Sequence, residues 1–145
     1  PDPLKIVEAE SIRAVVDAGI IPVCCGGGGV PVIRDSSTGL YTGAQAVIDK
    51  DLCAAILARE TGAELLVIAT DVDGVYTDWG TPQQRRIDHA KPSDLERSQF
   101  ADGSMGPKVR AACRFVRRTG QRAVIGSLED IGDIVAGRAG TLIEP

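Results

Sequence analysis

Short apolar runs alternate along this chain with segments in which apolar residues recur every three or four positions. Continuous apolar runs are typical of strands that are buried on both faces of a parallel sheet. They occur at residues 20–25, 65–69, 123–125 and 141–143. The three-to-four spacing predicts helices in the intervening segments, namely one that ends at Gly19, then 49–62, 94–100, one from Met105 through Val116, and 127–137.

This alternation predicts an α/β fold. With right-handed crossovers, such a chain forms a three-layer sandwich with a mostly parallel central sheet and helices on both faces. Ser93 and Glu96 form a capping box at the start of helix 94–100, and Asp102 begins a break before the next helix. Residues 34–43 predict a surface loop or a short hairpin, and the polar, basic stretch that ends at Arg86 predicts a connection.

The composition indicates one ordinary domain. Its 145 residues, 43% of them hydrophobic and 25% charged, are enough to bury a substantial core. The net charge of −4 and the 3% of aromatic residues argue against general nucleic-acid binding. No apolar run approaches the roughly 20 residues that cross a membrane. The first residues also lack the features of a signal peptide, so we expect a cytoplasmic protein.

The cysteines do not form a metal-binding pattern. Cys24, Cys25, Cys53 and Cys113 contain no C-x-x-C pair, and His89 alone cannot complete a zinc site. Each cysteine lies in an apolar run, so we expect buried free thiols and no metal site held by the protein itself. No serine or cysteine has a credible histidine partner, which argues against a hydrolase with a nucleophilic triad.

Three predicted loops follow strands and should meet at one edge of the sheet. They are Gly26–Gly29, Thr70–Tyr76 and Gly126–Ser127, and ligands of open α/β sheets bind at the carboxyl ends of the strands. The glycine run fits neither common phosphate fingerprint, because G-x-x-x-x-G-K-[ST] is absent and Pro31 stands where the dinucleotide motif needs a small residue. The run indicates either a close approach of the backbone to a ligand or a purely conformational turn.

Two lysines stand at predicted helix starts, where the helix dipole does not favour a cation. A helix amino terminus attracts anions, so Lys50 and Lys108 suggest a phosphate group near both helices. A lysine ammonium can follow a phosphoryl oxygen through a transfer reaction, and Asp51 could hold the lysines in position. The alternative is that both lysines are solvated and that Asp51 only complements the helix dipole.

Other polar and aromatic residues near this edge allow two interpretations each. Tyr76 and Met105 could sandwich an adenine, although their spacing favours packing against the core or its rim. Asp71 and Asp73 could hold a metal ion, or they could form a turn that leads out of a strand.

Seven motifs are distributed over nearly the whole chain. They are Ile6–Glu8, Cys25–Val32, Ala46–Leu52, Thr70–Tyr76, Gly103–Val109, Ser127–Asp130 and Ala139–Thr141. In this order and spacing they resemble the carbamate kinases, a group within the amino acid kinase family. The resemblance implies reversible phosphoryl transfer between ATP and carbamate with Mg²⁺, giving ADP and carbamoyl phosphate. It also implies a place in arginine breakdown, where such enzymes form ATP.

The resemblance implies roles for individual residues. Lys50 is similar to the family lysine that contacts the transferring phosphoryl group, Asp51 to the aspartate that organises the catalytic lysines, and Lys108 to the lysine on the terminal phosphates. The nucleotide pocket would be lined by Thr70, Asp71, Tyr76, Met105 and Lys108, and the phosphate or acceptor side by Gly26, Gly27 and Gly28. Fixed ammonium groups and Mg²⁺ stabilise the loose transition state without a covalent intermediate.

The resemblance also implies that residues 1–145 are one domain, the carboxy-terminal nucleotide-binding portion of a longer enzyme. In that family the amino-terminal half carries a phosphate loop, another catalytic lysine and most of the carbamate pocket. We therefore expect this piece alone to be inactive and the complete protein to be a homodimer. Gln45 departs from the glutamate usual in the family. Two alternatives stay open: a stand-alone nucleotide-binding module, or a relative with an acylamino acid or uridylate acceptor.

Overall fold

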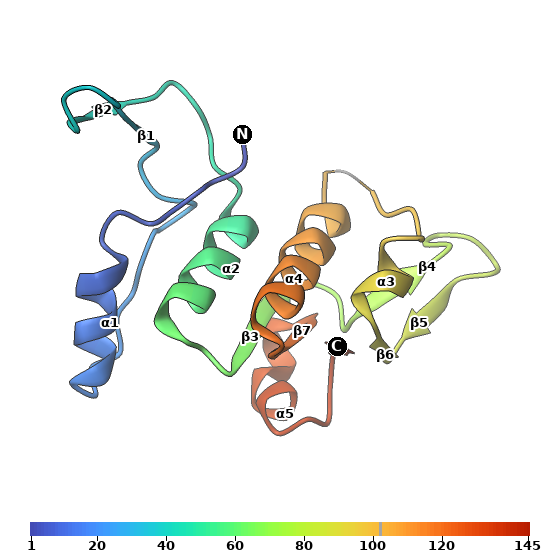
Figure 1. Ribbon diagram of the computed structural model, residues 1–145. Coiled ribbons are helices and arrows are strands. Elements are labelled where there is room, and N and C mark those ends of the chain that lie inside the picture. The colour runs from blue at the N-terminus through green and yellow to red at the C-terminus, as the bar shows by residue number, and fades with distance from the viewer. Residues whose placement is uncertain (102) are drawn as a thin grey trace.

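The computed structural model describes residues 1–101 and 103–145 as an α/β sandwich (Figure 1). A four-stranded sheet in the order β3-β7-β8-β6 forms its centre, α2 and α4 pack side by side on one face, and α5 lies against the other. The helices are α1 (Ala9–Asp17), α2 (Lys50–Thr61), α3 (Pro92–Leu95), α4 (Met105–Thr119), the 3₁₀ turn η1 (Leu128–Asp130) and α5 (Ile131–Val135). The strands are β1 (Val32–Arg34), β2 (Tyr41–Gly43), β3 (Leu65–Thr70), β4 (Val75–Thr77), β5 (Arg85–Ile87), β6 (His89–Ala90), β7 (Arg122–Ser127) and β8 (Thr141–Ile143).

The central sheet is mostly parallel, as the alternation of elements predicts. β3 pairs in parallel with β7, and β6 pairs in parallel with β8, whereas β7 and β8 are antiparallel. The β3–β7 register places Thr70 opposite Ser127. Two of the three predicted loops therefore begin side by side at the carboxyl edge of the sheet.

Two small hairpins lie outside this sheet. β1 and β2 form the first, which confirms the short-hairpin alternative for 34–43, with the first strand beginning two residues earlier, at Val32. The turn is closed by the carboxylate of Asp35, which accepts hydrogen bonds from the backbone N–H groups of Ser37 at 2.8 Å and Thr38 at 2.7 Å. β4 and β5 form the second. The sequence predicts a connection up to Arg86 and names no strand in it. The hairpin escapes that prediction because strands of three mostly polar residues show no apolar alternation.

Local sequence rules explain both ends of α2 and the end of α4, but not the start of α3. The carboxylate of Asp49 caps α2 by accepting hydrogen bonds from the second and third backbone N–H groups after it, at 3.0 and 2.9 Å. Gly62 ends α2 with φ +74° and Gly120 ends α4 with φ +69°. The capping box predicted at Ser93 is wrong: α3 begins at Pro92, since proline suits the first helical turn, and it ends at Leu95. Asp102 of the predicted break lies outside the described residues.

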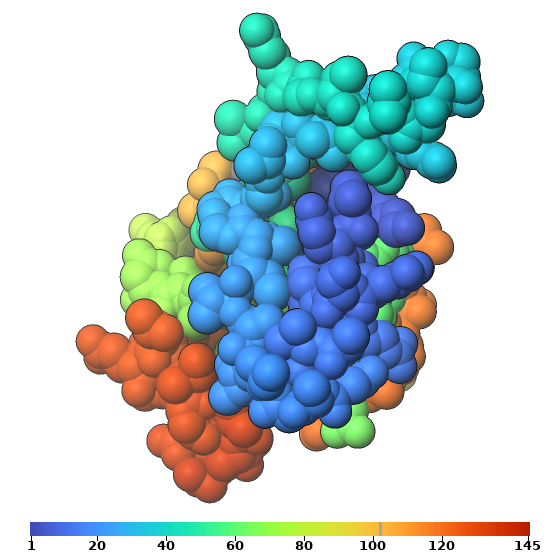
Figure 2. All heavy atoms as spheres, turned by 90° about the vertical axis from the view of Figure 1, so that its left-hand side faces the viewer, coloured from blue at the N-terminus to red at the C-terminus, as the bar shows by residue number. Residues whose placement is uncertain are grey.

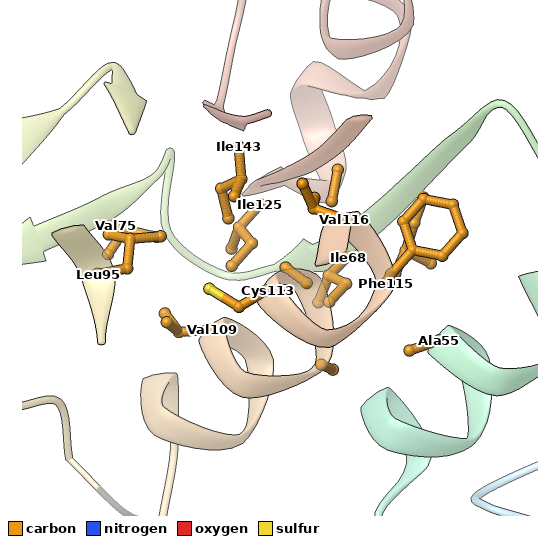
Figure 3. Packing of buried hydrophobic residues seen from close by; sticks show 14 of the residues in the cluster. Ala55, Ile68, Val75, Leu95, Val109, Cys113, Phe115, Val116, Ile125 and Ile143 are labelled. Carbon is orange, nitrogen blue, oxygen red and sulfur yellow. The ribbon is translucent and has the colours of Figure 1, made fainter. Parts of the chain in front are cut away.

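The core lies between the sheet and helices α2 and α4 (Figure 3). Ile125 and Ile143 from the sheet pack with Phe115 and Val116 from α4, and each of these four side chains is at most 1% exposed. Alternate residues of β7 face the opposite side of the sheet, toward α5. A Cβ at Gly126 would lie 2.8 Å from the Ile134 side chain, so α5 can approach the sheet closely only because this position is glycine.

The apolar run 20–25 is not a strand. The prediction of a buried strand there is wrong, because Ile21 is 92% and Val23 100% exposed. Figure 2 shows the segment lying across the surface beside α1. An apolar run becomes a strand only when a neighbouring strand pairs with its backbone, and none of the strands in the described ranges does so here.

The cysteines agree only partly with the expectation of buried thiols. Cys53 and Cys113 are buried, and burial raises their pKa to about 12 and about 11, respectively. Cys24 and Cys25 are only half-buried.

Within residues 1–101 and 103–145, no group of three potential metal ligands gathers. In the same part of the chain, no helix has the length and apolar character that a membrane span requires.

Replacing a core side chain should cost far more stability than replacing one from the exposed run. We expect Phe115→Ala to lower the free energy of unfolding by about 3–5 kcal/mol, because it removes a fully buried ring from between α4 and its neighbours. Ile21→Ala should change it by less than about 0.5 kcal/mol. Urea unfolding followed by circular dichroism measures both values, and similar losses in the two variants would contradict this core.

Candidate active site

An aspartate and two lysines meet where α2 and α4 begin. The ammonium group of Lys108 donates a hydrogen bond to the Asp51 carboxylate at 3.0 Å, and the ammonium group of Lys50 lies 3.8 Å from the same oxygen. The side chains of Asp51 and Lys108 are only 10% and 12% exposed, whereas that of Lys50 is 62% exposed. The structure therefore brings together all three predicted catalytic residues.

The fold explains why these residues meet. Both α2 and α4 lead back to a strand of the sheet, so their amino termini lie at the same edge as the carboxyl ends of β3 and β7 (Figure 1). The two helices pack directly against each other. Asp51 and Lys108 stand in the first turns of their helices, and each can reach the other across this contact.

The electrostatics of this cluster favour an anion. The two ammonium groups outnumber the Asp51 carboxylate, and the amino terminus of α4, which no side chain of the described residues caps, adds the positive end of a helix dipole. The amino terminus of α2 is already capped by the Asp49 carboxylate. Lys108 is held by its buried ion pair, while Lys50 extends into solvent with freedom to follow a ligand. The interpretation of two solvated lysines is wrong for Lys108, which is nearly buried.

The glycine loop lies next to this cluster. The backbone N–H groups of Gly28 and Gly29 both donate to the Cys25 carbonyl, at 3.0 and 2.6 Å, and form a tight turn. A Cβ at Gly28 would lie 2.3 Å from the carbonyl oxygen of Ile48, just before α2. Position 28 therefore requires glycine, both for the tight turn and for the close approach to the Ile48 carbonyl. Gly26 and Gly27 are exposed, with open space around them.

The predicted nucleotide loop follows β3 and is closed by its own hydrogen bonds. The Thr70 hydroxyl donates to the Asp71 carboxylate at 3.0 Å, and the Tyr76 phenol donates to Asp73 at 2.8 Å. The bond to Asp73 raises the pKa of Tyr76. The ring of Trp79 contacts the Tyr76 ring edge-on, with centroids 5.2 Å apart. Asp71 and Asp73 thus take part in the hydrogen bonds that close the turn.

The structure does not join every predicted site residue by direct contacts. Across the described ranges, no hydrogen bond or ion pair links the Lys50, Asp51 and Lys108 cluster to the loop Thr70–Tyr76. Met105 is half-buried and packs against the core one turn before Lys108, as its spacing indicates.

Comparisons with known proteins identify the family of this chain. The model of the amino acid kinase family matches residues 1–127. The chain belongs to the amino acid kinase family. Among the curated members, the carbamate kinases of Haemophilus influenzae and of Escherichia coli K12 are each 50% identical to it over 143 residues. Each match covers 99% of this chain and 46% of the relative, so the chain spans about half the length of these family members.

Solved structures of the family show the same fold. A carbamate kinase from Giardia lamblia bound to AMP-PNP superposes with a TM-score of 0.94 at 38% identity, over 99% of this chain and 51% of that one. A UMP kinase from Bacillus anthracis superposes with a TM-score of 0.66 at 20% identity, over 94% of this chain and 50% of that one, which shows a shared fold only. These matches confirm the predicted amino acid kinase fold with a mostly parallel central sheet.

Sequence reasoning did not find two residues that contact the predicted nucleotide loop. Arg86 lies 3.4 Å from the Asp73 carboxylate, and the Thr141 hydroxyl accepts a hydrogen bond from the Val75 backbone at 2.7 Å. Thr141 belongs to the motif Ala139–Thr141, and this is the one signal in the sequence that could have identified it. Its contact with Val75, 66 positions away, leaves no local pattern.

Removing the carboxylate of the cluster should destabilise the fold. We expect Asp51→Asn to lower the free energy of unfolding by about 3–5 kcal/mol, because the nearly buried ammonium group of Lys108 loses its counter-charge. The matched control is Asp17→Asn, which breaks the exposed 3.9 Å pair with Arg13 and should cost less than about 1 kcal/mol. Equal changes in chemical denaturation would show that the Asp51 pair is no more than a surface contact.

Proposed function

We propose that this chain is the nucleotide-binding part of a carbamate kinase, which transfers a phosphoryl group reversibly between ATP and carbamate. The observation that supports this most directly is the cluster of Lys50, Asp51 and Lys108 at two helix amino termini. It occurs on a chain that is 50% identical to carbamate kinases. Likeness to UMP kinases is limited to the fold, so a uridylate acceptor has no support of this kind.

In this proposal the lysines stabilise charge during transfer. Lys108, fixed by Asp51, contacts the terminal phosphates of the nucleotide. The more exposed Lys50 follows the moving phosphoryl group. A loose transition state spreads negative charge over the phosphoryl oxygens, so positioned ammonium groups lower its energy without forming a covalent bond to the protein. Asp51 sets the spacing of the two charges.

The nucleotide itself would lie along the carboxyl edge of β3. Thr70, Asp71 and Tyr76 follow that strand, Met105 precedes Lys108 by one helical turn, and Gly26 and Gly27 face open space on the phosphate or acceptor side. The described residues contain no carboxylate cluster for a resident metal ion. Mg²⁺ would therefore arrive as part of the substrate, bound to the phosphates of ATP or ADP.

The complete protein would need a second half to act. We place most of the carbamate pocket and a further catalytic lysine there, so that the 145 residues alone bind nucleotide without turnover. In arginine breakdown, the full enzyme would form ATP from carbamoyl phosphate and ADP, in the cytoplasm and as a homodimer. The support for these statements is the resemblance to carbamate kinases.

Binding of Mg-ADP to this chain tests the nucleotide site. We expect saturable heat in isothermal titration calorimetry, and a loss of about 1.5–3 kcal/mol of binding free energy in Lys108→Ala, since a hydrogen bond to a charged phosphate is removed. Lys91→Ala, which removes an exposed lysine just before α3, is the matched control and should bind as the wild type does. Absence of binding to the wild-type chain would contradict a nucleotide site in these residues.

Turnover tests the role of Lys50. In an enzyme completed with the missing half, Lys50→Ala should lower kcat by far more than it weakens nucleotide binding, because its charge acts mainly on the moving phosphoryl group. Steady-state kinetics of ATP formation from carbamoyl phosphate, beside a nucleotide titration, separates the two effects. Equal losses in kcat and in affinity would assign Lys50 to ground-state binding instead.

A further inference from the structure

The segment Asp73–Tyr76, which leads from β3 into β4, is anchored by a side chain from the last strand. Thr141, at the start of β8, is completely buried. Its hydroxyl accepts a hydrogen bond from the backbone N–H of Val75 at 2.7 Å and donates one to the backbone carbonyl of Ile87. Val75 and Ile87 face each other across the β4–β5 ladder. A single hydroxyl therefore ties this hairpin to the central sheet.

Arg86 holds the same segment from β5. Its guanidinium lies 3.4 Å from the Asp73 carboxylate and 3.0 Å from that of Asp88. It also donates to the backbone carbonyls of Asp73 at 3.4 Å and Gly140 at 3.2 Å. Asp73 in turn accepts the hydrogen bond of the Tyr76 phenol at 2.8 Å. The position of the phenol thus depends on Arg86 through Asp73.

Gly74 passes between the two anchoring side chains. A Cβ at this position would lie 2.8 Å from the Thr141 hydroxyl oxygen and 3.1 Å from Nε of Arg86. A side chain at position 74 would therefore clash with both groups, and glycine lets the backbone pass between them.

We propose that Thr141 and Arg86 are positioning residues of the nucleotide site, which hold Asp73–Tyr76 so that Tyr76 is presented to the nucleotide. This inference rests on the proposed function, because it assumes that Tyr76 lines the nucleotide pocket. Neither residue is placed on the nucleotide itself. They act through the backbone of Val75 and the carboxylate of Asp73.

Packing alone does not require a hydroxyl at position 141. The core around β8 includes Val75, Ile125 and Ile143, and a valine would fill nearly the same space as threonine. A buried hydroxyl is costly unless its hydrogen bonds are satisfied, and here both partners are backbone groups of the hairpin. If Thr141 only stabilised the fold, its replacement would lower stability, but the folded protein would still bind nucleotide normally.

The test compares the dissociation constant of Mg-ADP among folded variants of this chain by isothermal titration calorimetry. Thr141→Val should weaken binding by about tenfold or more, because two backbone groups of the hairpin lose their partner. Thr141→Ser keeps the hydroxyl and should bind within about threefold of the wild type. Ile143→Val, a fully buried position in the same strand, should lose stability yet bind like the wild type. Circular dichroism establishes that each variant is folded at the titration temperature.

Arg86→Gln repeats the test outside the core, at a side chain that is 34% exposed, and should also weaken binding. It keeps the proposal testable if Thr141→Val does not fold.

Each failure has a distinct meaning. A wild-type chain that takes up no Mg-ADP overturns both the proposed function of these residues and the positioning roles. A wild-type chain that binds, beside folded Thr141→Val or Arg86→Gln variants that bind equally well, overturns the positioning role of the residue concerned and leaves the proposed function standing. Weak binding by Ile143→Val would also overturn the inference, because any loosening of the core would then release the nucleotide.

Discussion

The ion pair between Asp51 and Lys108 is the contact on which the arrangement of the candidate site depends. Nearly buried ion pairs contribute little net stability, because removing two charges from water offsets most of their attraction. They do fix geometry, since either partner alone would leave an uncompensated charge inside the protein. Here the pair joins the first turns of α2 and α4. The positive ends of both helices are thereby held toward one place at the edge of the sheet.

Much of this arrangement could be predicted from local sequence. Helix α4 has a periodic apolar face, and both long helices end at glycine. The lysines at their starts stand out because the helix dipole does not favour them. Once the helices are known to return to a parallel sheet, their amino termini must share an edge. The positions of these residues at the helix starts are enough to predict the cluster. The 3.0 Å hydrogen bond from Lys108 to Asp51 is not predictable in this way, because it requires the packing of α2 on α4.

The features that escaped prediction depend on distant partners or on choices that sequence leaves open. The hydroxyl of Thr141 acts on the backbone of a hairpin 66 residues earlier, so no window of sequence contains both partners. The capping box at Ser93 was locally plausible, but Pro92 begins the helix earlier. Glycine at position 28 suits a ligand contact and a tight turn equally well. The carbonyl of Ile48 shows why the turn needs glycine at this position, because it occupies the space a side chain would need.

The exposed run at residues 20–23 has a consequence for the behaviour of this chain in solution. Ile20, Ile21 and Val23 are 59%, 92% and 100% exposed, in an extended segment whose backbone has no strand beside it among the described residues. Such a segment offers apolar side chains, and backbone groups that no neighbouring strand in the described ranges pairs with, to any other chain it meets. Self-association through this segment would grow with protein concentration. Dilute solution should therefore favour a monodisperse isolated chain.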